Sequence, residues 1–179
     1  MPEGFCYAEN VLTAAEERAM VEQFDALPFR PFEFHGYLGK RRIVSYGFRY
    51  DYGERALRDS AAIPDFLLPL RDRAAQFAQL PAESLEQVLV TEYASGAGIG
   101  WHRDKPMFSD VIAFSFGAPC VLRFRKKSGA SWQRCKQLLL PRSAYRLSGP
   151  ARWEWHHSIP GVEALRYSVT FRNFVAGRR

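Results

Sequence analysis

Apolar and polar residues alternate in the second half of the chain, within short runs that Gly, Pro and Ser separate. Alternation of this kind sends successive side chains to opposite faces of a β-strand. Seven short strands with turn signals between them are typical of a β-sandwich or jelly roll. The runs that show the pattern are residues 86–93, 110–117, 120–127, 132–140, 143–149, 152–159 and 166–174.

Two segments ahead of these runs have helical spacing. In residues 13–27, Thr13 and Glu16 are spaced as in a capping box, and apolar residues recur at helical intervals. In residues 64–80, Pro64 suits the first turn and the apolar residues share one face. The sequence therefore predicts an α+β protein: a double-stranded β-helix (jelly roll) core with two N-terminal helices packed on it.

Composition sets bounds on the domain and its partners. The 179 residues suit one domain over residues 1–179, and 47% of them are hydrophobic. The net charge is +6 and the sequence pI is about 9.4. A basic protein favours polyanionic partners, because each phosphate contact releases counterions, but charge alone fits a merely basic soluble protein equally well. We expect a monomer that binds nucleic acid.

Three cysteines, with no CxxC pair, argue against a disulfide framework and favour a reducing compartment. The first ten residues lack the basic and apolar regions of a signal peptide. No apolar run approaches 18 residues, so we expect no membrane span and a cytoplasmic location.

A histidine and a carboxylate lie two residues apart at His102 and Asp104. On a strand, such residues point to the same face, and an imidazole beside a carboxylate makes two-thirds of the facial triad of non-haem Fe(II) oxygenases. Either His156 or His157 lies far enough downstream to supply the third ligand. The pair alone is a weak signal, because a surface histidine beside a solvated aspartate looks the same.

Two arginines and two hydroxyls share one face of the last run. Arg166, Ser168, Thr170 and Arg172 alternate with apolar residues. Buried, they would need an anion, because a buried charge is costly unless it is paired, and arginine binds carboxylates with two hydrogen bonds. An edge strand with a solvated basic face fits the same periodicity.

Four pieces of residues 86–174 resemble the AlkB family of Fe(II)/2-oxoglutarate dioxygenases, in that family's order. They are a strand ending in Tyr93, the triplet His102-Arg103-Asp104, the segment beginning at His157, and the closing RYSVTFR of residues 166–172. The resemblance implies that His102, Asp104 and His157 hold Fe(II). It also implies that O2 and 2-oxoglutarate are consumed, that succinate and CO2 are released, and that an alkyl group is hydroxylated.

The resemblance implies roles for further residues. Arg166 is similar to the residue that pairs with the distal carboxylate of 2-oxoglutarate, and Arg172 to a second arginine near the metal. Tyr93 is similar to a tyrosine that hydrogen-bonds the co-substrate. Thr91 and Ser168 stand where the family has Asn. With Thr170, these complete the set expected to line the co-substrate site.

Residues 29–58 alternate aromatic and polar residues with glycines between them, which predicts hairpins or a long loop. This segment resembles the family's substrate-recognition lid, in which rings stack on bases and basic groups follow phosphates. Rings that simply cover the core are the plainer interpretation. The residues expected to contact substrate are Lys40, Arg41, Arg42, Tyr46, Phe48 and Tyr50.

The substrate expected from the resemblance is an alkylated base, in DNA repair or in transfer RNA modification. In the family's bacterial repair enzyme the motif is followed by Lys and then by an acidic residue that contacts the base, whereas Lys105 precedes Pro106 here. Two alternatives are the same oxygenase chemistry on a protein side chain or small molecule, and a non-catalytic jelly-roll binding module.

Overall fold

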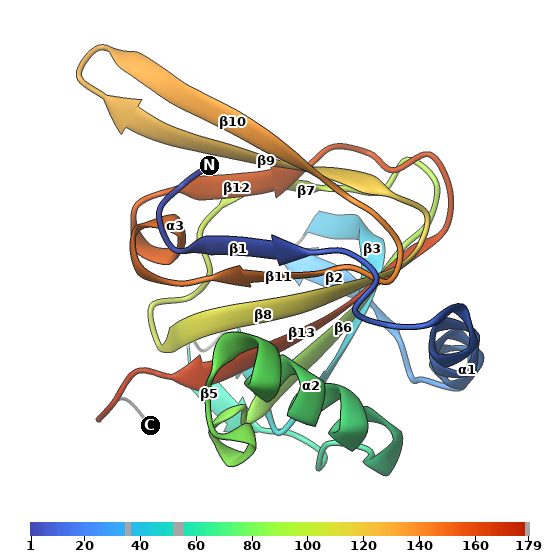
Figure 1. Ribbon diagram of the computed structural model, residues 1–179. Helices are drawn as coiled ribbons and strands as arrows, with labels where there is room; N and C mark the ends of the chain where they lie inside the picture. The colour runs from blue at the N-terminus through green and yellow to red at the C-terminus, as the bar shows by residue number, and fades with distance from the viewer. Residues whose placement is uncertain (35–36, 52–55, 178–179) are drawn as a thin grey trace.

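Two β-sheets face each other, and helices cover the outer face of the larger one (Figure 1). The computed structural model describes residues 1–34, 37–51 and 56–177. The jelly roll is confirmed, and each of the seven runs predicted as strands contains one. Within the described residues, no helix is both long and apolar enough to cross a membrane.

The larger sheet has the order β1-β11-β8-β13-β6-β3-β2, and its described pairings are antiparallel. Strand β13 lies near its centre, between β8 and β6, so it is not the solvated edge strand that periodicity left open. The strands are β1 (Phe5–Ala8), β2 (Arg30–Phe34), β3 (Tyr37–Tyr46), β6 (Gln87–Tyr93), β8 (Phe108–Gly117), β11 (Ala144–Leu147) and β13 (Arg166–Phe174).

The smaller sheet has the order β10-β9-β12-β7. Its long β9–β10 hairpin extends beyond the rest of the molecule at the top of Figure 1. A separate hairpin pairs β4 with β5. The strands are β7 (Ile99–His102), β9 (Cys120–Ser128), β10 (Ser131–Leu139), β12 (His156–Ile159), β4 (Phe48–Asp51) and β5 (Ala56–Asp59).

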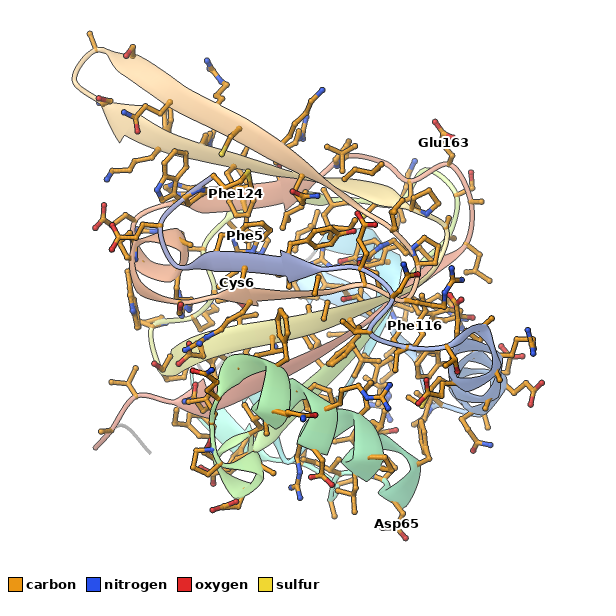
Figure 2. The ribbon with its side chains drawn as sticks, in the orientation of Figure 1. Phe5, Cys6, Asp65, Phe116, Phe124 and Glu163 are labelled. Atoms are coloured by element: carbon orange, nitrogen blue, oxygen red, sulfur yellow. The ribbon has the colours of Figure 1, made fainter. Side chains whose placement is uncertain are left out.

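Alternation along the strands divides the interior into two cores. Tyr167, Val169 and Phe171 of β13 enter the core under the helices, while the intervening residues enter the space between the sheets. In that space Phe124 packs edge to face on Phe5, with ring centroids 5.1 Å apart (Figure 2). The sheets therefore enclose a second, partly polar interior.

The helices differ from the predicted arrangement in their order along the chain. Helices α1 (Ala14–Phe24) and α2 (Leu68–Ala78) fall within the predicted segments, but β1 precedes α1 and four strands separate the two. The run at 152–159 is also not one strand. Its first two residues belong to a short helix, α3 (Gly149–Trp153). The helix begins here because Ser148 adopts an extended N-cap conformation and Pro150 suits a helical first turn.

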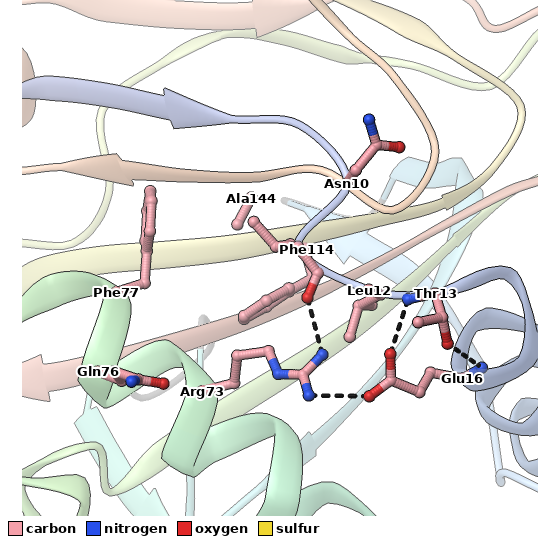
Figure 3. A pocket seen from close by; sticks show the side chains of 10 residues that line it. Asn10, Leu12, Thr13, Glu16, Arg73, Gln76, Phe77, Phe114 and Ala144 are labelled. Atoms are coloured by element: carbon pink, nitrogen blue, oxygen red, sulfur yellow. Dashed lines mark hydrogen bonds and ion pairs between the residues drawn. The ribbon is translucent and has the colours of Figure 1, made fainter.

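Helices α1 and α2 meet across a cavity of about 560 Å³ on the helix side of the larger sheet (Figure 3). The capping box predicted at Thr13 and Glu16 is present. Arg73 of α2 donates to the Val11 carbonyl at 2.7 Å and to the Glu16 carboxylate at 2.8 Å (Figure 3). Thr13, Glu16 and Arg73 are thus joined by hydrogen bonds at this cavity, which we interpret as a structural seam between the two helices.

We expect Glu16→Gln to lower the free energy of unfolding by about 1 kcal/mol at pH 7, the usual cost of losing a helix cap. The hydrogen bond from Arg73 is the main cause that lowers the pKa of Glu16 to about 2. A lowered folded-state pKa means that this stability is present above the ordinary pKa of 4.5 and is lost as the pH falls toward about 2. Urea unfolding at pH 7, 4.5 and 3.5 measures it. Exposed Glu22→Gln is the control. If Glu16→Gln lowered the free energy of unfolding equally at all three pH values, the ionised Glu16 carboxylate would not be the source of this stability.

Candidate metal and co-substrate site

Three potential metal ligands converge between the sheets. One ligand atom from each of His102, Asp104 and His157 lies within 4.8 Å of the others. His157 Nε2 is 3.5 Å from Asp104 Oδ2, and the two imidazole centroids are 4.2 Å apart. Two imidazoles and one carboxylate on one side of a space are the donor set of the facial triad, which leaves coordination positions open.

Strand register brings the two histidines together. His157 of β12 lies directly opposite His102 of β7 in an antiparallel pair. The strands approach closely at Gly98, where a Cβ would lie 2.6 Å from the Ile159 carbonyl oxygen, so only glycine fits. Register thus selects His157 over His156, which is on the opposite face of the strand.

Asp104 lies just after β7, not on the strand as predicted. The turn that carries it is held by Arg152 of α3, which is 3% exposed and donates to the carbonyls of Lys105 and Phe108 at 2.6 and 2.7 Å. Arg103 donates to the Trp153 carbonyl at 2.8 Å. Helix α3 therefore fixes the position of the carboxylate from outside the strand.

Arg172 fixes the orientation of that carboxylate. Its guanidinium meets Asp104 Oδ1 at 3.0 and 2.8 Å and donates a further hydrogen bond to the Gln87 amide oxygen at 2.9 Å. Burial by itself would raise the pKa of Asp104, but Arg172 and the two histidines lower it well below its ordinary value. The carboxylate is therefore ionised, as a metal ligand must be.

Both histidines are neutral in this setting. Burial, followed by the neighbouring His102, lowers the pKa of His157 to about 3, and burial also lowers the pKa of His102. His102 Nδ1 lies 2.9 Å from the Gly100 carbonyl, which accepts a hydrogen bond and leaves Nε2 for a metal. The ligands are thus in the protonation states that bind a cation.

A buried arginine fits the co-substrate. Arg166 is fully buried, and one of its nitrogens donates to Ser115 Oγ at 3.0 Å. Among the described residues, its Nε and Nη1 have no partner in hydrogen-bonding geometry. A buried charge with unused donors is costly without an anion, and a carboxylate would satisfy both. The residues present therefore fit a metal and an acidic co-substrate together.

The remaining residues expected to line the co-substrate site share this interior. Tyr93 lies directly opposite Arg166, with the guanidinium carbon 5.0 Å from its ring centroid. Thr91 lies opposite Ser168, and both are buried, as is Thr170. The structure brings all of them to the face that carries Arg172.

Arg41 and Phe48, expected to contact substrate, also lie toward this interior. Arg41 donates a long hydrogen bond of 3.5 Å to the Gly98 carbonyl at the start of β7. The Phe48 ring packs on Phe174, which in turn packs on Phe108, below the guanidinium of Arg172. These two residues border the site.

Other residues of that expected set lie elsewhere. Tyr46 is buried in the core under the helices, and Arg42 makes a two-pronged ion pair with Glu92 on the same face. Lys40 is exposed on β3. The side chain of Tyr50 lies outside the described residues. Alternation along β3 therefore directs Tyr46 and Arg42 away from the metal ligands.

Three residues of the site carried no motif in the sequence. All three are buried. Arg152 holds the turn that carries Asp104, Gln87 accepts a hydrogen bond from Arg172, and Ser115 accepts one from Arg166. Gln87 and Ser115 are polar residues at inward positions of apolar strands, and this pattern could have identified them as site residues. Arg152 had no such signal, because its run was predicted to be strand.

A cleft of about 450 Å³ is lined in part by two of the three potential metal ligands, His102 and Asp104. Basic and aromatic side chains dominate its lining, and Asp104 is the acidic group among them. Besides His102 and Asp104, the lining comprises Trp101, Arg103, Lys105, Pro106, Arg152, Trp153 and His156.

Residues 4–172 match the 2OG-Fe(II) oxygenase superfamily, and the chain belongs to this class of dioxygenases, which use Fe(II), 2-oxoglutarate and O2. Within the class it is of the AlkB type, as the motifs predicted. It is 32% identical over 181 residues to the alkylated DNA repair protein ALKBH8 homolog of Arabidopsis thaliana. The match covers 88% of this chain and 51% of that protein.

A more distant relative is similar in sequence, and a solved structure is similar in fold. The chain is 26% identical over 166 residues to the Xenopus tropicalis tRNA (carboxymethyluridine(34)-5-O)-methyltransferase alkbh8, covering 89% of this chain and 25% of that protein. Its fold is similar to that of OsALKBH1, with a TM-score of 0.72 at 18% identity over 97% of both chains. The chain thus spans about half the length of the Arabidopsis relative and about a quarter of the Xenopus one.

We expect His157→Ala to weaken Co(II) binding more than about 100-fold, beyond the usual cost of losing an outer-shell partner. The neighbouring His156→Ala, on the other face of the strand, should change it little. Titration of the purified protein followed by visible absorption of the bound Co(II) measures both. Equal weakening in the two variants would remove His157 from the ligand set.

We expect Arg166→Met to raise the Kd for 2-oxoglutarate about 10- to 150-fold, because it removes charged hydrogen bonds to a carboxylate. Anaerobic calorimetry on Co(II)-loaded protein measures the change. Arg146→Met is the matched control, since Arg146 binds Asp110 and the Ala78 carbonyl instead. An unchanged Kd in Arg166→Met would place the carboxylate elsewhere.

Proposed function

We propose that this dioxygenase oxidises an alkyl substituent on a base of nucleic acid, in DNA repair or transfer RNA modification. The observation that carries the proposal is the cleft that His102 and Asp104 help to line. It presents Arg103 and Lys105 beside Trp101 and Trp153. Cations suit phosphates, and indole rings suit flat bases.

His102, Asp104 and His157 are proposed to hold Fe(II), which with 2-oxoglutarate and O2 supplies the oxidising chemistry. Arg172 orients Asp104 through the two contacts described above. Arg166 is proposed to bind the distal carboxylate of the co-substrate through its unused donors. With the metal ligands and the co-substrate arginine assigned in this way, the cleft lined by His102 and Asp104 is left for the substrate.

Residues 29–58 are proposed to form a substrate lid over this cleft. Residues 35–36 and 52–55 lie outside the described part of the chain. Within the described part, Arg41 and Phe48 support the proposal, because both border the interior that holds the metal ligands. Tyr46 and Arg42 are left out of it, since they point to the helix side of the sheet.

The names of two relatives indicate which substrates to test first. One relative is an alkylated DNA repair protein homolog, and another is a transfer RNA carboxymethyluridine methyltransferase. Substituted uridine in a transfer RNA anticodon is therefore the first candidate. A cytoplasmic location is part of the proposal, supported by three cysteines that are all free.

The same chemistry on a protein side chain or small molecule is the second candidate function. Pro106 favours it, because it stands where the bacterial repair enzyme has an acidic residue that contacts the base. The basic lining of the cleft weighs against it. The non-catalytic module has no support, because the triad is complete and the chain belongs to a dioxygenase superfamily.

We expect succinate formation by the Fe(II)-loaded protein to be stimulated by one member of a nucleic acid panel. The panel comprises transfer RNA with substituted anticodon uridines, methylated RNA and methylated DNA. Mass spectrometry of the recovered nucleosides identifies the oxidised base, and Asp104→Ala is the inactive control. Succinate that no nucleic acid stimulates would sink the proposal and favour the second candidate.

A further inference from the structure

The chain's excess positive charge is concentrated in one hairpin. Strands β9 and β10 carry six basic residues and no acidic one, within a chain of 25 basic and 19 acidic residues. The rest of the chain is therefore neutral overall. The six are Arg123, Arg125, Lys126, Lys127, Arg134 and Lys136.

Register gathers five of these charges on one face. Arg134 lies directly opposite Arg125, and Lys136 lies directly opposite Arg123. Lys127 follows on the same face, opposite Trp132. Like charges in directly opposite positions destabilise a β-sheet. The face therefore has a local electrostatic cost that a bound polyanion would offset.

Aromatic rings are interleaved with these charges. The Arg125 guanidinium lies 4.5 Å from the Trp101 ring centroid and 4.6 Å from that of Trp132. The Arg123 guanidinium lies 5.1 Å from the Trp101 ring centroid. Trp132 is 37% exposed, which leaves indole surface open to solvent. Indole rings held beside arginines form a surface on which bases can stack.

This outer face is continuous with the metal cleft. Trp101 lines the cleft and also contacts Arg123 and Arg125. His156 lines the cleft too, and lies opposite Arg125 in the β12–β9 pair. Within the described part of the chain, no acidic side chain pairs with the five outward basic residues. Glu154 pairs with Lys126, which alternation places on the other face.

We propose that the outer face of the β9–β10 hairpin docks a single-stranded segment of nucleic acid next to the base that enters the cleft. Arg125, Arg134 and Lys136 contact its phosphates, and Trp132 stacks on one of its bases. The proposal rests on the proposed function and deepens it. A strand bound on this hairpin would run past Trp101 to the metal ligands, so the site would bind well beyond the target nucleotide.

The test is binding of a fluorescently labelled single-stranded RNA oligonucleotide to the Co(II)-loaded protein of 179 residues, by anisotropy across a salt series. Arg134→Glu should raise the Kd and lower the slope of log K against log salt by about 0.7, the value for one phosphate contact. Arg18→Glu makes the same charge change at an exposed position on α1, remote from the hairpin in Figure 1, and should leave the slope unchanged.

Trp132→Ala probes stacking without a change in charge. It should raise the Kd for the single strand about 5- to 150-fold, the range for one base–aromatic stack, and should spare the salt slope. The same oligonucleotide annealed to its complement should respond little to Trp132→Ala, because its bases are paired. Equal losses on both forms would overturn the stacking role.

The outcomes separate this inference from the proposed function. If wild-type protein binds and oxidises nucleic acid but Arg134→Glu behaves like Arg18→Glu, the hairpin surface is overturned and the function stands. If Arg134→Glu loses binding while no nucleic acid stimulates succinate formation, the surface stands and the substrate assignment fails. If wild-type protein binds no oligonucleotide at any salt concentration, both are overturned.

Discussion

Strand β13 has a hydrogen-bonded neighbour along each edge, so each of its side chains from Arg166 to Arg172 must enter one of two buried spaces. Its apolar residues enter the core under the helices, which leaves two arginines and two hydroxyls between the sheets. Those arginines need partners there. Arg172 has Asp104 and Gln87, whereas Arg166 has Ser115 and two unused nitrogens. A one-residue slip of this strand would exchange the two faces and lose both halves of the site.

A two-residue period predicts one part of the site, because it puts Arg166 and Arg172 on one face of their strand. Tyr93 and Thr91 are predicted instead by the resemblance to the AlkB family, and they lie opposite Arg166 and Ser168 in the structure. The period alone cannot choose between His156 and His157 without the partner strand, because adjacent residues differ only in face. Pairing with His102 makes that choice, and sequence spacing does not contain it.

Where the prediction differed from the structure, contacts distant in sequence were the cause. The pattern predicts a strand at Arg152, but this residue belongs to helix α3. Its guanidinium holds the turn after β7 by donating to the carbonyl of Phe108, which is 44 residues away in the sequence. Arg42 was grouped with substrate contacts, but Glu92 on the next strand pairs with it on the opposite face. Such pairs depend on which strands become neighbours, and short-range pattern does not carry that information.

Strand β7 is the four-residue edge of the smaller sheet, and within the described residues it pairs with β12 alone. A short edge strand is ordinarily the first part of a sheet to open. Here its last residue, His102, and its turn residue, Asp104, both face His157 of the inner strand. A cation held by all three would tie the edge to the interior, much as a crosslink does. Amide-proton exchange in residues 99–102 would then report the fraction of molecules that carry metal, independently of any turnover.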